Sequence, residues 1–241
     1  MYEPRTYRDW SRDKDLVSFT VIVKETDLFI RASKNLQNEA YELVLKYRSQ
    51  LEKYIEKHPR FLTTLEPFTV GDDAPPIVKS MAEAASKVDV GPMAAVAGAI
   101  AELVGNELSA LSPEVIGENG GDSYLKSLKD RMVGIYAGDS PFTGRIGVEI
   151  NGQDTPMGIC TSSGTVGPSL SFGKADAVTV LAKSATLADA AATAIGNLIV
   201  DASDIPKGIE FAKGVAGLTG VVIIKGKDMG LWGEVKIVKL A

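Results

Sequence analysis

The chain has 241 residues, of which 45% are hydrophobic and 24% charged, and its formal net charge is −5. These values are typical of a globular protein, and no cluster of Lys and Arg gives an electrostatic case for binding nucleic acid or an anionic membrane. The single cysteine, Cys160, excludes an intrachain disulfide and a cysteine-based zinc site. The single histidine, His58, excludes a histidine-rich metal site. The N-terminus shows no apolar leader and the longest apolar run, residues 90–101, is too short to span a bilayer, so we expect a cytoplasmic protein.

Residues 1–70 contain none of the 24 glycines and predict a framework of a β-hairpin and a long helix. Runs rich in β-branched and aromatic residues at 16–23 and 28–32 predict the hairpin, with its turn at 25–27. Apolar residues then recur at helical spacing over residues 35–57. We expect this amphipathic helix to pack on a sheet through Leu36, Leu43 and Leu51.

Residues 71–241 hold all the glycines and mix helix and strand patterns. The helices expected here are 77–86, 93–106, 186–199 and Ile205–Gly214. The strands expected are 114–118, 132–137, 144–150, 158–162, Ala177–Ala182, 220–225 and 234–240. Because these elements follow no regular βαβ period, the sequence predicts an α+β fold with a mixed β-sheet and packed helices, built as a single domain over residues 1–241.

Gly120, Gly121 and Asp122 follow a predicted strand and form the first candidate ligand-binding segment. Two consecutive glycines let the backbone bend sharply and let a ligand approach the main chain closely. The alternative is an ordinary turn, which is the preferred interpretation of this motif on its own.

The segment from Cys160 to Gly167 carries four hydroxyl side chains and two glycines. Within it, the candidate ligand contacts are Thr161, Ser162, Ser163 and Gly164. Hydroxyls and exposed amides at the end of a strand suit phosphate oxygens, although the Gly-Lys-Ser/Thr signature of a P-loop is absent. A Ser/Thr-rich surface loop is an equally good interpretation.

Asp189 and Thr193 are the candidate metal ligands, since their i, i+4 spacing puts both on one face of the helix predicted at 186–199. Thr186 and Asn197 extend that stripe. Asp189 is the only charged residue between positions 185 and 200, whereas exposed helix faces are normally rich in Lys and Glu. We therefore expect a shielded carboxylate whose partner is a hard cation such as magnesium or an Arg or Lys side chain. The alternative is a solvated helix face.

Two further features have structural explanations that we prefer. Residues 91–101 are small and apolar, which favours a tightly packed core helix over a space for a flat ligand. Cys160 follows Gly158 and Ile159 in a strand that we expect to be buried, where free thiols are usually inert.

Taken in order, these segments resemble the ApbE flavin-transferase superfamily. ApbE proteins have a glycine-rich helix start, a strand ending in Gly-Gly-Asp, a Thr-Ser-Gly segment and an Ala-Asp-Ala-x-Ala-Thr-Ala helix. The similar segments here are residues 91–102, 120–122, 161–164 and 188–194. The run at 169–180 looks like the signature of a family allied to ApbE, and the resemblance covers about residues 90–200.

The resemblance implies a single ApbE-like domain that binds FAD or FMN together with magnesium. ApbE flavin transferases use magnesium to attach FMN, through its phosphate, to a Thr or Ser of a partner protein. By this resemblance Asp189 and Thr193 bind the metal, and segments 120–122 and 161–164 face the dinucleotide. The chain departs from ApbE in two places. No histidine stands at 167–171, where ApbE proteins carry a His-x-x-Asp-Pro motif, and the family lysine is missing from 91–98.

Three functions remain open from the sequence. One is a magnesium-dependent enzyme that acts on a flavin or another nucleotide pyrophosphate, by FMN transfer or by cleavage. Another is a non-catalytic module that keeps the ligand pocket. The third is a role in sulfur assimilation or homocysteine formation, an association of the allied family that only Cys160 supports directly in this chain. The expected partner is a small-molecule nucleotide or flavin rather than nucleic acid or a membrane, and a homo-oligomer is left open.

Overall fold

The structure is a computed structural model that describes residue 8, residues 15–166 and residues 171–240. Its helices are α1 (Gln37–Lys57), α2 (Arg60–Thr63), α3 (Pro76–Lys87), α4 (Val96–Leu108), α5 (Ala185–Leu198) and α6 (Ile205–Gly214). Short 3-10 helices are η2 (Pro92–Ala95), η3 (Gly152–Asp154) and η4 (Ala202–Asp204). The strands are β1 (Val17–Val23), β2 (Thr26–Ala32), β3 (Val115–Asn119), β4 (Asp122–Lys126), β5 (Arg131–Gly134), β6 (Ile146–Ile150), β7 (Met157–Ser162), β8 (Ala177–Ala182), β9 (Leu218–Lys225), β10 (Asp228–Gly233) and β11 (Lys236–Lys239).

An eight-stranded sheet runs through the molecule in the order β1-β2-β3-β4-β7-β8-β9-β10. The α+β class expected from the sequence is confirmed, but every strand pairing among the described residues is antiparallel rather than of mixed direction. The connections explain this. Two helices, α5 and α6, separate β8 from β9, so the chain returns to the end at which β8 finished and enters β9 in the opposite direction.

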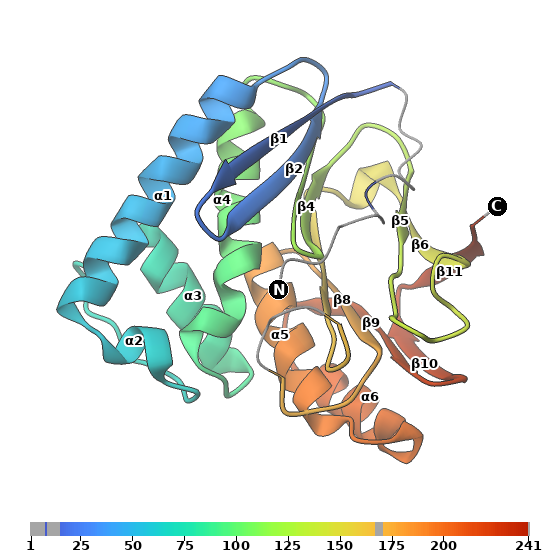
Figure 1. The fold of residues 1–241 in the computed structure, drawn as a ribbon. Helices are drawn as coiled ribbons and strands as arrows, with labels where there is room; N and C mark the ends of the chain where they lie inside the picture. Colours follow the sequence, from blue (N-terminus) through green and yellow to red (C-terminus); the bar gives the residue numbers. More distant parts are fainter. Residues whose placement is uncertain (1–7, 9–14, 167–170, 241) are drawn as a thin grey trace.

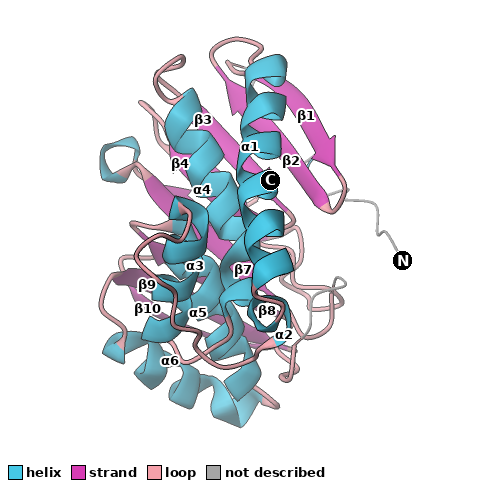
Figure 2. Cartoon of the chain, turned by 90° about the vertical axis from the view of Figure 1, so that its left-hand side faces the viewer, coloured by secondary structure: helices cyan, strands magenta, loops and turns pink. Residues whose placement is uncertain are grey.

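The molecule has three layers. Helices cover one face of the eight-stranded sheet, as Figure 2 shows, and a small sheet of order β11-β6-β5 packs on the other face. Side chains alternate along the strands, so Val178 and Val180 of β8 contact the helix layer while Ala177 and Leu181 contact the small sheet. This alternation decides which face of the sheet each candidate site residue reaches.

Helix α1 packs against β1, α3 and α4 along one side of the molecule (Figure 1). Its buried stripe consists of Ala40, Val44, Tyr47 and Leu51, and Leu36 is buried just before the helix begins. Leu43 lies at the margin of this stripe and is only partly buried. Side chains from both sides of residue 71 share one hydrophobic cluster. The division into a glycine-free framework and a site-bearing part stays a prediction.

Some elements differ from those expected. The first hairpin turns at Lys24 and Glu25, and residues 26 and 27 belong to β2. Lys24 has a φ of 54°, the left-handed conformation that a two-residue hairpin turn needs, so the turn predicted at 25–27 is wrong. The sequence did not predict α2, β4 or β10. The strand β10 contains Gly230 and Gly233 and therefore has the composition of a loop.

No single helix among the described residues is long and apolar enough to cross a membrane. Within the described part of the chain, one pair of segments, α3 and η2–α4, reaches that length and composition when taken together, and the chain bends by 105° between them.

Candidate functional site

The turn between β3 and β4 consists of Gly120 and Gly121, whose φ angles are 71° and 104°. L side chains rarely adopt this left-handed region, so the two-residue turn requires glycine at both positions. Asp122 is not part of the turn; it begins β4 and pairs with Asn119 of β3. Asp122 and Tyr124 lie on the same face of β4, and Tyr124 belongs to the core under the helices. The Asp122 side chain is therefore directed toward the helix layer.

The hydroxyl-rich segment forms the end of β7, the strand next to β4, so the two motifs lie side by side. Asp122 is the register partner of Cys160. A Cβ atom added to Gly121 would lie 3.5 Å from the carbonyl oxygen of Thr161. The intervening chain forms β5 and β6 of the small sheet and then returns to the large one.

The hydroxyls of this segment point to different faces. The Thr161 and Thr179 hydroxyls share a hydrogen bond of 2.9 Å on the face away from the helices. Ser162 lies on the helix side, where its Oγ is 3.6 Å from the position of a Cβ atom on Gly196 of α5. Strand alternation causes this difference, and only Ser162 of the two reaches the side on which Asp122 lies.

Beyond the end of β7, residues of this segment form hydrogen bonds with their own neighbours. Ser163 Oγ accepts hydrogen bonds from the backbone N–H groups of Thr165 (3.1 Å) and Val166 (3.0 Å). Gly164 is exposed, and its backbone N–H donates to the carbonyl oxygen of Ala175 at 2.9 Å. Gly167, the last residue of this motif, lies outside the described residues, as do positions 169 and 170 of the family-like run.

Asp189 lies in the middle of α5 and is only 8% exposed. Its Oδ2 accepts a hydrogen bond of 2.8 Å from the backbone N–H of Gly98. Gly98 is in the first turn of α4, where N–H groups have no partner within the helix and the helix dipole favours negative charge. The described structure thus gives Asp189 a main-chain partner, rather than the Arg or Lys side chain considered from the sequence.

This contact depends on the close approach of α4 and α5. A Cβ atom on Gly98 would lie 2.3 Å from the carbonyl oxygen of Ala185 and 2.8 Å from Cβ of Asp189, which is closer than such atoms can approach. The small residues at 91–101 form a tightly packed helix start, as preferred from the sequence. They also bring an amide to a buried carboxylate, a role that the sequence did not reveal.

Thr193 lies one helical turn after Asp189 and is partly exposed. The two ends of the predicted stripe have structural roles. Thr186 donates through its backbone N–H and Oγ1 to Glu102 at 2.8 and 2.9 Å. Asn197 Oδ1 accepts from the backbone N–H of Phe172 at 2.9 Å. Of the central pair, Asp189 is bonded to the main chain of α4.

Asp122 and Asp189 form a buried acidic pair. Burial raises the pKa of Asp122 well above its usual range, and the charges of Asp189 and Glu118 raise it further, against the lowering effect of hydrogen bonds from Cys160 and the backbone of Thr161. Burial also raises the pKa of Asp189 to about 7, against the lowering effect of hydrogen bonds from Gly98 and Ala97. Asp122 Oδ1 is buried without a hydrogen-bond partner. Because an uncompensated buried carboxylate is costly, the arrangement is suited to a cation.

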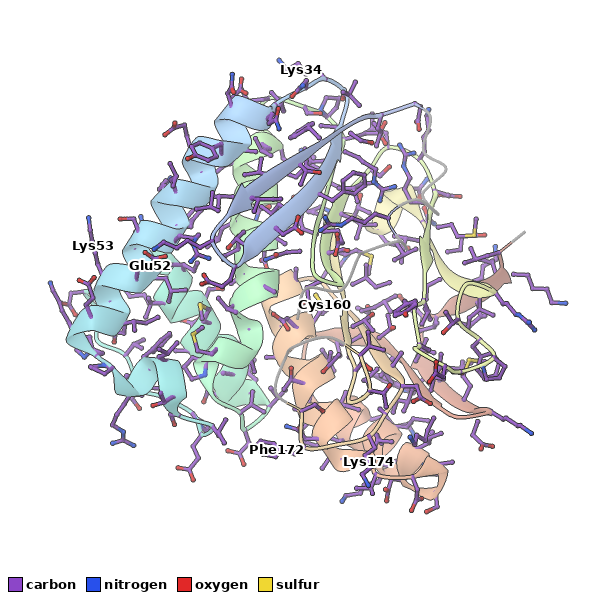
Figure 3. The ribbon with its side chains drawn as sticks, in the orientation of Figure 1. Lys34, Glu52, Lys53, Cys160, Phe172 and Lys174 are labelled. Carbon is purple, nitrogen blue, oxygen red and sulfur yellow. The ribbon has the colours of Figure 1, made fainter. Side chains whose placement is uncertain are left out.

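Cys160 lies in the interior of the molecule, whereas Lys34 and Lys53 lie at its outer margin (Figure 3). The thiol donates a hydrogen bond to the carbonyl oxygen of Ala185 at 3.3 Å. Burial raises the pKa of the thiol well above its usual range, and the charges of Asp122 and Asp189 raise it further. The protonated, fully buried thiol is a poor nucleophile, so this environment does not favour the sulfur-related function.

Two residues just before the glycine pair hold the turn in place and were not chosen from the sequence. Glu118 Oε1 accepts from the backbone N–H of Gly121 at 2.6 Å, and its Oε2 pairs with Arg8 at 2.6 Å. The Asn119 side-chain amide donates to the carbonyl oxygen of Ala97 at 3.2 Å and so links the turn to α4. The position of these two residues beside Gly120 could have indicated their role in the turn. Most of the groups that they bind are distant in the sequence, so the contacts could not be predicted from it.

A cavity of about 70 Å³ lies at the other ends of β7 and β8, and the residues that line it include Met157, Leu181, Lys183 and Glu234. It is separate from the acidic pair. The cleft expected to join segments 120–121 and 161–163 therefore stays a prediction.

Comparison with protein families and sequences identifies the relatives of the chain. The family model described as AbpE bacteria matches residues 8–211. A UPF0280 protein of Methanococcus vannielii is 45% identical over 92% of this chain and 92% of its own length. A UPF0280 protein of Methanocaldococcus jannaschii is 44% identical over 89% of this chain and 90% of its own length.

Solved structures show the same fold. The apo flavinyl transferase ApbE of Pseudomonas stutzeri superposes with a TM-score of 0.60, covering 90% of this chain and 93% of that one, at 14% identity. The flavin transferase ApbE of Vibrio cholerae gives a TM-score of 0.52 at 14% identity, covering 94% of this chain and 97% of that one. The chain therefore has an ApbE-like fold and belongs to the family described as AbpE bacteria and, with its UPF0280 relatives, to the UPF0280 family.

Proposed function

We propose that this protein binds a flavin dinucleotide, or a related nucleotide pyrophosphate, together with magnesium where segment 120–122, segment 161–164 and helix α5 meet. The observation that carries the proposal is the buried pair of Asp122 and Asp189 beside the glycine turn, with one carboxylate oxygen unpartnered. Such a pair needs positive charge, and a pyrophosphate needs a cation to neutralise its own charge. One magnesium ion satisfies both requirements.

In this proposal Asp189 and Thr193 hold the metal, since one face of α5 presents both side chains. Magnesium ordinarily keeps several waters and uses one or two carboxylates together with phosphate oxygens, so a small set of protein ligands is sufficient. When bound, the ion polarises the phosphorus–oxygen bonds of the pyrophosphate.

The glycine turn and the hydroxyl segment serve the remainder of the ligand. Gly120 is exposed and has no side chain, which leaves its backbone open to close approach. Ser162 offers a hydroxyl on the side of the sheet that carries the acidic pair, and Ser163 and Gly164 continue the same edge. Thr161 contributes its main chain, because its hydroxyl is bonded on the other face.

Binding is better supported than group transfer. The solved structures of similar fold are named flavin transferases, but at 14% identity they support the fold only. The sequence lacks the histidine and the lysine that the ApbE resemblance would place near the ligand. Because the two residues that the resemblance links to transfer are missing, binding is the function that the geometry supports best.

The test is to titrate the purified protein with FAD, with and without magnesium, by calorimetry, and to analyse the mixture chromatographically for FMN and AMP. We expect magnesium-dependent binding. Release of FMN and AMP would add pyrophosphate cleavage to the function. FMN attached to an added Thr-containing protein would establish transfer.

The control variants are two aspartates in different settings. Asp189→Asn should weaken magnesium-dependent FAD binding at least tenfold, whereas Asp201→Asn, at an exposed position that caps η4, should not change it. Equal binding of FAD with magnesium and with chelator would contradict the proposal, as would an Asp189→Asn protein that binds like the wild type.

A further inference from the structure

Asp122 occupies an unusual position for a strand aspartate. It begins β4, faces the helix layer and is 8% exposed. Its backbone pairs with Cys160 of β7, and α5 packs on both β4 and β7. The carboxyl group therefore lies between the sheet and the helix that carries Asp189, and the charge of Asp189 acts on it directly.

The neighbouring polar groups have partners, but Asp122 Oδ1 does not. Glu118 is held by Arg8 and the amide of Gly121. Asn119 donates to the carbonyl oxygen of Ala97 and accepts from the backbone N–H of Asp27 at 3.4 Å. These side chains do not need a further ligand, whereas a buried carboxylate oxygen without a donor does.

No cationic side chain within residues 8, 15–166 and 171–240 forms a salt bridge with Asp122 or Asp189. Cys160 is the register partner of Asp122, but its thiol is engaged by the carbonyl oxygen of Ala185 at 3.3 Å. The atom that remains without a partner, Asp122 Oδ1, is a hard carboxylate oxygen, a type of ligand that prefers magnesium or manganese to zinc or copper.

We propose that Asp122 is a second carboxylate ligand of the cation held by Asp189, so that one divalent ion bridges strand β4 and helix α5 before any nucleotide binds. This inference rests on the proposed function for the location of the metal and adds Asp122 to Asp189 and Thr193 as a direct ligand of the ion. It also explains why the strand after the glycine turn begins with an aspartate directed into the helix layer.

The ligand set fits a weakly held, water-rich ion. Among the described residues no group of three His, Cys, Asp or Glu side chains is placed to bind a metal, so two carboxylates are the whole acidic contribution. Octahedral magnesium or manganese completes such a set with water, the Thr193 hydroxyl or incoming phosphate oxygens.

The test uses Mn²⁺ alone as the probe, counted by electron paramagnetic resonance of the free ion, with circular dichroism to establish that each variant is folded. We expect the wild-type protein to bind one Mn²⁺ per chain without nucleotide, in competition with Mg²⁺. Asp122→Asn and Asp189→Asn should each weaken Mn²⁺ binding at least tenfold.

A third variant provides the matched control. Asp176 is also a buried aspartate, but its two oxygens accept from Thr165 Oγ1 (3.2 Å) and from the backbone N–H of Gly226 (2.6 Å). Asp176→Asn should bind Mn²⁺ like the wild type. If Asp122→Asn does not fold, Asp122→Glu provides the second test, because its longer side chain displaces the carboxylate and should also weaken binding.

Two outcomes overturn the inference: a wild-type protein that binds no Mn²⁺ without nucleotide, and an Asp122→Asn protein that binds it unchanged. The FAD titration separates this failure from failure of the proposed function. FAD binding that still requires Mg²⁺ in Asp122→Asn, with unchanged Mn²⁺ affinity, leaves the proposed function intact. Loss of Mn²⁺ binding in Asp122→Asn, in a protein that never binds FAD, supports the cation site and contradicts the flavin ligand.

Discussion

A buried acidic side chain lies at each end of the β3–β4 hairpin, and the two differ in their hydrogen-bond partners. At the open end, Glu114 Oε2 accepts hydrogen bonds from Ser127 (2.5 Å), from the backbone N–H of Leu128 (3.1 Å) and from Arg131 (2.7 Å). At the turn end, Asp122 is equally buried but has an unpartnered oxygen and faces a second carboxylate. The same hairpin therefore carries one acid whose hydrogen bonds are complete and one whose hydrogen bonds are not, separated by the length of a five-residue strand.

The difference distinguishes stability from function. Burial raises the pKa of Glu114, but hydrogen bonds from Ser127, Arg131 and Leu128 outweigh it and the net pKa is lowered. Glu114 therefore remains charged and ties the hairpin to Arg131. The turn-end pair keeps raised pKa values because nothing among the described residues supplies comparable positive charge. A buried acid lowers the stability of the ligand-free fold, and a bound ligand of opposite charge would offset that free-energy cost.

The largest expected effect is a loss of stability when the partner of Glu114 is removed at the open end of the hairpin. Arg131→Met leaves the buried Glu114 without its cation and should lower the free energy of unfolding by about 3 to 5 kcal/mol. The matched control is Lys129→Met, which removes an exposed ion pair with Asp15 and should cost far less stability than Arg131→Met. Urea denaturation of both variants measures the difference, and equal losses would show that Arg131 does not stabilise the buried Glu114 in the way described.

A smaller effect of opposite sign is expected at the turn end. Asp122→Asn removes a buried acid that lies near a second one, so at pH 8 without divalent cations it should raise the free energy of unfolding by about 1 to 2 kcal/mol. Saturating Mg²⁺ should abolish this advantage by stabilising the wild type. Thermal melts with chelator and with Mg²⁺ make the comparison, and a destabilised Asp122→Asn in chelator would mean that the carboxyl group is already satisfied.

The stabilising effect of Glu114 should depend on pH. Its folded pKa is lowered below its ordinary value of 4.5, so the unfolded chain binds the proton more readily. The stabilisation is fully present above pH 4.5 and is lost as pH falls through that value toward the lowered one. The stability difference between wild type and Glu114→Gln, followed by urea denaturation, should therefore shrink on acidification. A difference that grows at low pH would contradict the assigned sign.

The smallest structural effect concerns Cys160. Its thiol is fully buried and its pKa is raised, so a thiol reagent should label it roughly a hundredfold or more slowly in the folded protein than in denaturant. Cys160→Ala should keep Mg²⁺-dependent ligand binding. Rapid labelling of the folded protein, or loss of binding in Cys160→Ala, would return the thiol to consideration as a functional group.

Local patterns in the sequence were sufficient for most elements. Ala177–Ala182 and Ile205–Gly214 were predicted with the observed bounds because a continuous apolar strand and a short amphipathic helix each have a clear period. The strand β4 was missed because it is short, polar at its start and directly follows the glycine pair. Leu43 was expected in the contact face of α1 but lies at its margin, since spacing alone does not determine the centre of a broad apolar stripe.

The sequence by itself indicated the candidate residues: a glycine pair after a predicted strand, and a lone carboxylate on an alanine-rich helix. Only the tertiary structure decided what they face. Strand alternation directed Thr161 away from α5 and Asp122 toward it. The partner of Asp189 is the amide of Gly98, 91 residues earlier, because two helices approach closely there. Local periodicity fixes the direction of a side chain within its own element, whereas burial and charge compensation depend on elements that are brought together only by folding.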